Sequence, residues 1–390
     1  MLTYLSASII YPVSKPPIVN GIIAVDEAGY IRGLYGPEAA QALNIKAGHH
    51  YEGALVPGFV NTHCHLELSH LRDKIPQHTG LFRFVGQVMQ HRFAAEAEIM
   101  EAMEQADLEM YQNGIVATGD ISNRAISASV KQKSKIYYHT FVEAMGFNPA
   151  QAATIMNKAL ETASSFSPLK ASIVPHAPYS VSDALFALIN VRAAATENLL
   201  SMHNQETAAE DEFFMHKQGD FLQLYEMLGL NIDFYQASGK SSLQTTLPKL
   251  PATKTLLVHN TQTKQSDVEF AKAQHRELYW CLCPNANLYI EDRLPDVKML
   301  DEEDLTITLG TDSLASNGQL SILAEMQTLQ KHTDIPFEKL LKWATLNGAA
   351  FLGISETYGS LDPGKRPGLL LLEDMKGEQL STATKVTRLY

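Results

Sequence analysis

The sequence predicts an α/β fold of parallel strands alternating with helices, and three observations lead to it. Eight compact apolar runs follow residue 54, each of a length suited to a buried strand. Amphipathic stretches long enough for helices separate them. Polar residues lie near the C-terminal ends of most runs, where eight-stranded barrels assemble their sites. The runs cover residues 54–65, 115–122, 136–146, 171–178, 199–206, 255–260, 278–284 and 306–312.

The segments between these runs carry the expected helix signals. The stretch 96–114 ends on Asn113 and Gly114, and Asn148 followed by Pro149 is typical of a helix start. Ser182 is positioned to cap the segment that follows it. Strands buried on both faces suit an open doubly wound sheet as well as a closed barrel, so the periodicity alone leaves both open.

The ends of the runs favour the barrel. His63 and His65 are separated by one residue, so in an extended strand their side chains project on the same side. Taken alone, they are equally compatible with two surface histidines beyond a strand. The other residues at run ends are His176, His203, Glu206, His259 and Asp312. Only a closed barrel brings this whole set together.

Composition restricts the class of protein and its partners. The chain has 390 residues, of which 45% are hydrophobic and 19% charged, so we expect a folded globular protein. The net charge of −12 argues against nucleic acid or an anionic membrane as the main partner. A small-molecule substrate is the better expectation.

The ends of the chain and its cysteines suggest a cytoplasmic protein. The N-terminal segment lacks the pattern of a secretion signal, and no run approaches the roughly 20 apolar residues of a membrane span. Three cysteines do not make a disulfide framework. We interpret Cys281 and Cys283 as small apolar residues of one buried strand rather than as a metal-binding pair.

Five motifs, in order along the chain, carry a resemblance to a known family. They are PGFVNTHCH, HAPYS, MHNQE, LVHN and LGTDSLASN. They resemble the successive signatures of the amidohydrolase superfamily, and most closely its purine and nucleoside deaminase branch. HLELS and GTDSLASN look most like aminodeoxyfutalosine deaminases, with S-adenosylhomocysteine and methylthioadenosine deaminases also similar.

The resemblance implies a (β/α)8 TIM barrel over residues 56–354, with a small β-sandwich formed by the N- and C-terminal segments, residues 1–55 and 355–390. The sequence agrees, because the first 55 residues resemble short strands with turns and the tail at 358–373 returns to strand-like character. One departure is Pro367 and Gly368, where the family often has an Ala-Asp pair.

The resemblance and the chemistry of the side chains together indicate one divalent metal. The expected ligands are His63, His65, His203 and Asp312, which suit zinc first and iron(II) as the alternative. Such an ion lowers the pKa of a bound water from about 15.7 toward 7. Many superfamily members bridge two metals with a modified lysine at the end of the fourth strand. This chain has Pro175 and His176 there, so we expect a single metal.

Three residues receive catalytic roles from the resemblance. Glu206 would protonate a ring nitrogen while water attacks the adjacent amine-bearing carbon. His259 would orient or deprotonate that water, and Asp312 would pass the proton to departing ammonia. The structural alternatives are a helix N-terminal carboxylate for Glu206 and a buried histidine bonded to backbone for His259.

Substrate contacts are less well defined by the sequence. His176 resembles the substrate-facing histidine of the fourth strand, with a further metal ligand as the alternative. Glu67 is assigned to ribose hydroxyls or to support of its loop. Arg72 and Arg83 are candidates for binding a substrate carboxylate, with solvated surface arginines as the alternative. Ser313 and Asn317 are candidates for supporting positions around the metal.

The leading hypothesis is a hydrolytic deaminase of an adenine-type nucleoside, with aminodeoxyfutalosine preferred. The second hypothesis is a deaminase or amidohydrolase acting on a free base such as guanine or on a cyclic amide. The third, of another class, is a catalytically silent barrel used for binding. The helical exterior is also compatible with a homodimer.

Overall fold

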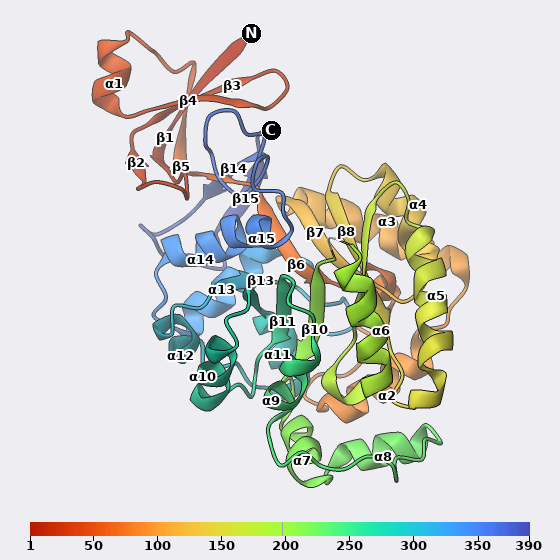
Figure 1. Ribbon diagram of the computed structural model, residues 1–390. Helices are drawn as coiled ribbons and strands as arrows, with labels where there is room; N and C mark the ends of the chain where they lie inside the picture. Colours follow the sequence, from red (N-terminus) through yellow and green to blue (C-terminus); the bar gives the residue numbers. More distant parts are fainter. Residues whose placement is uncertain (197) are drawn as a thin grey trace.

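A computed structural model describes residues 1–196 and 198–390, and its larger part consists of eight parallel strands surrounded by helices (Figure 1). Four strands form one sheet in the order β6-β7-β8-β9, and four form a second sheet in the order β10-β11-β12-β13. Their bounds are β6 Phe59–Cys64, β7 Ile115–Ser122, β8 Tyr137–Ala144, β9 Lys170–Pro175, β10 Leu200–Asn204, β11 Thr255–His259, β12 Leu278–Leu282 and β13 Ile307–Leu309. Each predicted apolar run coincides with one of these strands, and β9 begins one residue before its run.

Backbone hydrogen bonds connect the two sheets at both seams. The amides of Thr311 and Asp312 donate to the His63 carbonyl at 3.0 and 3.1 Å, next to a parallel bridge between Cys64 and Asp312. At the other seam, the His203 amide donates to the His176 carbonyl at 2.9 Å. These contacts complete the predicted (β/α)8 arrangement.

The apolar core explains why these strands form. Every residue of β7, β10 and β11 is buried, as expected for strands covered on both faces. The helices outside present one apolar side inward, and α3 (Glu96–Gln112) buries Ile99, Met103, Ala106 and Met110 at helical spacing. Cys281 and Cys283 are both buried in this core, with their sulfurs 3.9 Å apart.

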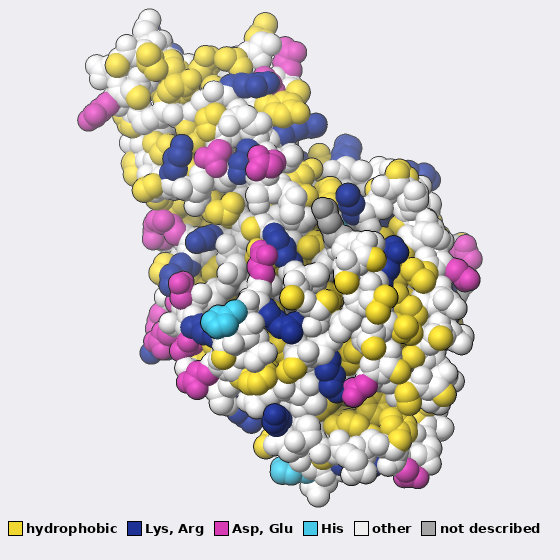
Figure 2. Space-filling view, in the orientation of Figure 1, with side chains coloured by type: hydrophobic (Ala, Val, Ile, Leu, Met, Phe, Trp, Pro, Cys, Tyr) yellow, Lys and Arg dark blue, Asp and Glu magenta, His cyan; other side chains and the backbone are white. Residues whose placement is uncertain are grey.

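The remaining helices cover the barrel and its openings. Around the barrel they are α2 Leu81–His91, α4 Ala128–Lys133, α5 Ala152–Ser164, α6 Asp183–Ala194, α9 Ser242–Thr246, α10 Gln265–Ala273, α11 Pro284–Glu291, α12 Val297–Glu302, α13 Ile322–His332, α14 Phe337–Ala344 and α15 Leu346–Phe351. The helices α7 Ala208–His216 and α8 Asp220–Met227 follow β10 and project from one end of the barrel (Figure 1). Basic and acidic side chains are interspersed on the face shown in Figure 2.

The two ends of the chain meet in a separate seven-stranded sheet. Its order is β15-β14-β5-β1-β3-β4, with β2 paired to β1. Its bounds are β1 Leu2–Ile10, β2 Ile18–Val19, β3 Ile22–Asp26, β4 Ile31–Tyr35, β5 His49–Pro57, β14 Leu369–Glu373 and β15 Lys385–Arg388, with helix α1 Pro37–Ala42 after β4. The strands β14 and β5 pair antiparallel, so the tail does join the first segment.

This terminal sheet has its own apolar core, which includes Leu5, Ile23, Leu55 and Leu371. It lies at the end of the molecule opposite α7 and α8 (Figure 1). The structure therefore realises the expected β-sandwich as one continuous sheet, and β5 extends two residues past position 55. The division of the chain into domains at residues 55 and 354 stays a prediction.

Among the residues that the structure describes, each helix is too short or too polar to cross a bilayer.

Candidate active site

A cluster of histidines and carboxylates lies at the C-terminal ends of the barrel strands. His63 and His65 project from the end of β6 to the same side, and their Nε2 atoms are 3.1 Å apart. Asp312 follows β13, and its Oδ1 lies 3.6 Å from Nε2 of His63 and 3.3 Å from Nε2 of His65. The spacing of one residue and the seam between β6 and β13 together produce this geometry.

His203, at the end of β10, completes the cluster. Its ring centroid is 4.9 Å from that of His63 and 5.4 Å from that of His65. Its Nδ1 donates to the carbonyl of His176 at 2.9 Å, because a carbonyl oxygen can only accept. That hydrogen bond fixes the tautomer and leaves the lone pair on Nε2.

This donor set fits a divalent cation. Nitrogen and carboxylate atoms within 4.8 Å of one another include the groups His63–His65–Asp312 and His63–His203–His259. Burial lowers the pKa values of His63 and His65, and lowers that of His203 to about 4, so the imidazoles are neutral. Neutral imidazoles with one carboxylate are the ligands that zinc and iron(II) accept.

Backbone conformation also marks this cluster. Asp312 and His259 have φ values of +56° and +76°, in the left-handed region that residues with a side chain seldom adopt. Such strain persists where surrounding contacts enforce it, and it is concentrated at functional sites. Ser316 donates a hydrogen bond to Oδ2 of Asp312, which holds the carboxylate so that Oδ1 faces the histidines.

Glu206 and His259 lie beside the cluster and face each other. Oε1 of Glu206 is 3.6 Å from Nε2 of His259, and both side chains are buried. Burial raises the pKa of Glu206 well above its usual value, which favours the protonated form of this carboxyl. Nδ1 of His259 lies 3.3 Å from the side-chain amide of Asn287, so the ring contacts side chains rather than the backbone.

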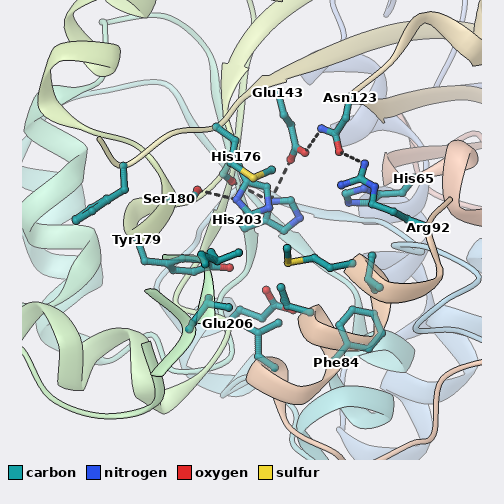
Figure 3. A pocket seen from close by; sticks show the side chains of 18 of the residues that line it. His65, Phe84, Arg92, Asn123, Glu143, His176, Tyr179, Ser180, His203 and Glu206 are labelled. Carbon is teal, nitrogen blue, oxygen red and sulfur yellow. Dashed lines mark hydrogen bonds and ion pairs between the residues drawn. The ribbon is translucent and has the colours of Figure 1, made fainter. Parts of the chain in front are cut away.

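A pocket of about 370 Å³ opens over this group (Figure 3). His65, His203, Glu206, His259 and Asp312 line its floor. The remainder of the lining is largely apolar and comes from α2, α8 and the ends of β8 and β9. The volume lies in the range of roughly 300–1,000 Å³ typical of small-molecule sites.

Only some of the residues predicted to contact or surround the substrate line the pocket. His176 lines the pocket, and its Nδ1 is 2.7 Å from the Ser180 hydroxyl. Ser313 also lines the pocket. Asn317 is outside the lining, and its side-chain amide donates to the Thr311 carbonyl at 2.9 Å.

Glu67, Arg72 and Arg83 are outside the lining of the pocket. Glu67 is buried and accepts from the backbone amides of Asn123 and Arg124 at 3.1 and 3.3 Å, so it supports its loop. Arg72 forms an ion pair with Glu109, and Arg83 is exposed on α2. The structure therefore gives no support to a substrate contact by either arginine.

Three polar residues of the pocket escaped the sequence analysis: Arg92, Asn123 and Glu143. Glu143 and Asn123 follow the same rule as the histidines, since Glu143 lies at the end of β8 and Asn123 directly after β7. Neither residue is a histidine, and neither lies in one of the five motifs. Arg92 ends α2, and nothing in the sequence distinguishes it from its neighbour Arg83.

A buried ion pair anchors the segment that carries His63 and His65. Lys131 and Asp120 are fully buried with Nζ and Oδ2 at 2.6 Å, and Lys131 also donates to the hydroxyls of Ser122 and Thr140. The other oxygen of Asp120 accepts from the Leu66 amide at 2.8 Å. Asp120 thus fixes the chain one residue after His65.

Comparison with known proteins agrees with this geometry. The pattern of the Amidohydrolase family matches residues 54–388. The adenosine deaminase of Helicobacter pylori is 26% identical over 335 residues, which are 84% of this chain and 80% of that protein.

Two solved structures share the fold. The aminofutalosine deaminase of Helicobacter pylori, in complex with methylthio-coformycin, superposes with a TM-score of 0.82 at 21% identity and covers 100% of both chains. An adenosine deaminase of Xanthomonas campestris with bound zinc gives a TM-score of 0.70 at 21% identity, covering 98% of this chain and 87% of that one. These matches confirm the family and the fold that the five motifs indicated.

Proposed function

Because the chain belongs to the amidohydrolase family, we propose that it is a hydrolytic deaminase of an adenine-type nucleoside, with aminodeoxyfutalosine as its first candidate substrate. One observation carries the proposal. A buried carboxyl, Glu206, and an imidazole, His259, face each other at 3.6 Å beside a cluster fit for a metal, on the floor of a pocket of ligand size. The relative from Helicobacter pylori named adenosine deaminase supports the same reaction class.

His63, His65, His203 and Asp312 would hold one divalent ion, with zinc as the first candidate and iron(II) as the second. When bound, such an ion acts as a Lewis acid that makes water nucleophilic near neutral pH. The seams of the barrel supply the rigidity that this requires, because both Asp312 and His203 are tied by backbone hydrogen bonds to the neighbouring strand.

Side chains of this protein would carry out the proton transfers of the reaction. Glu206 would donate its proton to the ring nitrogen next to the amine-bearing carbon, which makes that carbon electrophilic. His259 lies on the same floor and would take a proton from the attacking water. Asp312 would receive that proton from His259 and pass it to the amine, which leaves as ammonia, and the second proton of the water would return to Glu206. His176 would contact the purine from the side, with its ring held by Ser180.

The shape of the pocket favours a nucleoside over a free base. Its floor holds the reacting groups, and the apolar lining continues outward along Phe84, Val88, Leu224 and Leu228. A free base such as guanine would occupy the floor and leave that wall without contact. A nucleoside with a substituent beyond its sugar would fill it.

Release of ammonia by metal-loaded protein tests the proposal. The panel consists of aminodeoxyfutalosine, adenosine, methylthioadenosine, S-adenosylhomocysteine and guanine. We expect turnover of at least one nucleoside, abolished in Glu206→Gln and retained in Glu101→Gln, whose carboxylate is exposed on α3. Absence of ammonia from every nucleoside, with the metal bound, would contradict the proposal, and turnover of guanine alone would favour the free-base alternative.

A further inference from the structure

Three polar side chains form one edge of the pocket, away from the reacting groups (Figure 3). The Arg92 guanidinium donates to the Asn123 side-chain oxygen at 3.1 Å, and the Asn123 amide donates to Oε2 of Glu143 at 2.8 Å. Arg92 also lies 3.7 Å from Glu67. This chain of contacts holds the Glu143 carboxylate in one orientation.

The second oxygen of that carboxylate is free. The Glu143 side chain is only 2% exposed, and its Oε1 accepts no hydrogen bond from any residue that the structure describes. The nearest donor atom, Nδ1 of His203 at 3.5 Å, already donates to the His176 carbonyl at 2.9 Å. A buried acceptor without a partner is costly and uncommon, which points to a donor supplied by a ligand.

The position of Glu143 indicates which part of a ligand it meets. Glu143 lines the same pocket as Glu206 and His259, and its Oε1 lies 3.5 Å from Nδ1 of His203. In Figure 3, Glu143 and Glu206 lie on opposite sides of His203. The rest of a nucleoside whose amine-bearing ring reacts at Glu206 therefore faces the side of the pocket where Glu143 lies. The donors that a nucleoside carries next to its base are the hydroxyls of the sugar.

We propose that Oε1 of Glu143 accepts hydrogen bonds from the sugar hydroxyls of the substrate, so that the pocket selects ribonucleosides. The inference rests on the proposed deaminase function and specifies its substrate class. Arg92 contacts Asn123 and Glu67 through one nitrogen of its guanidinium, Nη2. Its role is to position Asn123, and through Asn123 the carboxylate.

The test compares ribonucleosides with their 2′-deoxy and 3′-deoxy analogues in the metal-loaded wild-type protein, in Glu143→Gln and in the surface control Glu101→Gln. For the wild type and the control, removal of the recognised hydroxyl should lower kcat/KM about 10- to 100-fold, the range expected of a hydrogen bond to a charged group. Glu143→Gln keeps an oxygen for Asn123 but loses the charge. In this variant kcat/KM for the ribonucleoside should fall by a similar factor. The ratio of kcat/KM for the ribonucleoside to kcat/KM for the deoxynucleoside should then approach one.

The deoxynucleoside separates binding of the sugar from support of the metal site. If Glu143 acts on the hydroxyl, Glu143→Gln should process the deoxynucleoside at nearly the wild-type rate and keep its full metal content. If Glu143→Gln lost kcat/KM equally on both substrates, or lost its metal, Glu143 would be assigned to the support of His203 and the inference would be overturned. Equal wild-type activity on the ribonucleoside and on both deoxynucleosides would also overturn it. The proposed deaminase function would survive either result, and it fails only if no nucleoside releases ammonia.

Discussion

The floor and the outer wall of the pocket are built in opposite ways. On the floor, His203, His259 and Asp312 stand at or just beyond the ends of buried strands, and each is at most 6% exposed. On the wall, apolar side chains come from the helices α2 and α8, and Met89 and Leu228 are 40% and 39% exposed. Hydrophobic side chains also gather over α6 and beside α8 on the outer surface (Figure 2).

This difference assigns separate tasks to the two regions. Side chains on strand ends are held by backbone hydrogen bonds on both sides, which suits groups that must meet one reacting atom within a fraction of an ångström. Helices inserted after a strand tolerate change without loss of the barrel. We therefore expect the floor to determine the reaction and the wall to determine the substrate, and the following experiments test that division.

Removal of the metal should have the largest effect. Dialysis against a chelator is expected to reduce deamination of every nucleoside to the background rate, and zinc or iron(II) should restore it. Metal analysis of the wild type and of Asp312→Asn checks the assignment, since loss of one ligand should lower the metal content. Full activity of protein shown to be free of metal would refute it.

Replacement of Glu206 should have the next largest effect. Glu206→Gln keeps the shape but cannot donate the same proton, so kcat should fall about 10²- to 10⁴-fold for every substrate. Because the ligands are untouched, the metal content should stay at the wild-type level. A rise in KM with kcat unchanged would place Glu206 in binding instead.

The pH dependence of kcat/KM should reflect the same carboxyl. Burial raises the pKa of Glu206, so its protonated form persists through the neutral range, and loss of that proton at higher pH removes the acid. Activity should hold near neutral pH and then fall about tenfold per pH unit on the alkaline side. A decline that begins near pH 5, where an ordinary glutamate has ionised, would contradict this role.

Truncation of the wall should change binding rather than chemistry. Phe84, on α2, is 8% exposed and lines the pocket. Phe84→Ala should raise KM about tenfold for nucleosides with a large substituent and leave kcat nearly unchanged, as expected for loss of about 1.5 kcal/mol of apolar contact. Phe93→Ala, with a side chain that is 72% exposed, is the matched control. An equal loss of kcat would remove the distinction between wall and floor.

The smallest effect is expected at Arg83. Its side chain is exposed and lies outside the lining of the pocket, so Arg83→Ala should change kcat/KM less than about twofold for substrates with and without a carboxylate. A large loss on carboxylate-bearing substrates alone would reinstate the substrate contact suggested by the sequence.

Much of the fold was predictable because the barrel repeats one signal. Each apolar run coincides with a strand of the barrel, and the pairing of the tail with the first segment followed from the strand-like character of residues 369–373. The continuity of the terminal sheet was not predictable, because pairing between distant strands depends on their register and not on their composition.

In the candidate site, too, some residues were predictable from the sequence and others were not. Histidines at strand ends are conspicuous in a sequence, so His63, His203 and His259 were identified from their positions. Arg72 and Arg83 were chosen for their charge and their place in the segment after the first strand, and the structure engages Arg72 with Glu109 and leaves Arg83 exposed. Arg92 and Glu143 line the pocket, although the sequence analysis named neither.

The sequence by itself determined the order of strands and helices, the residues that end each strand and the chemistry those residues can perform. These depend on local periodicity and on side-chain type. The tertiary structure alone decided which side chains share the pocket. Asp312 lies beside His63 and His65, and Glu143 faces His203, only because closure of the barrel brings together strands far apart in the chain.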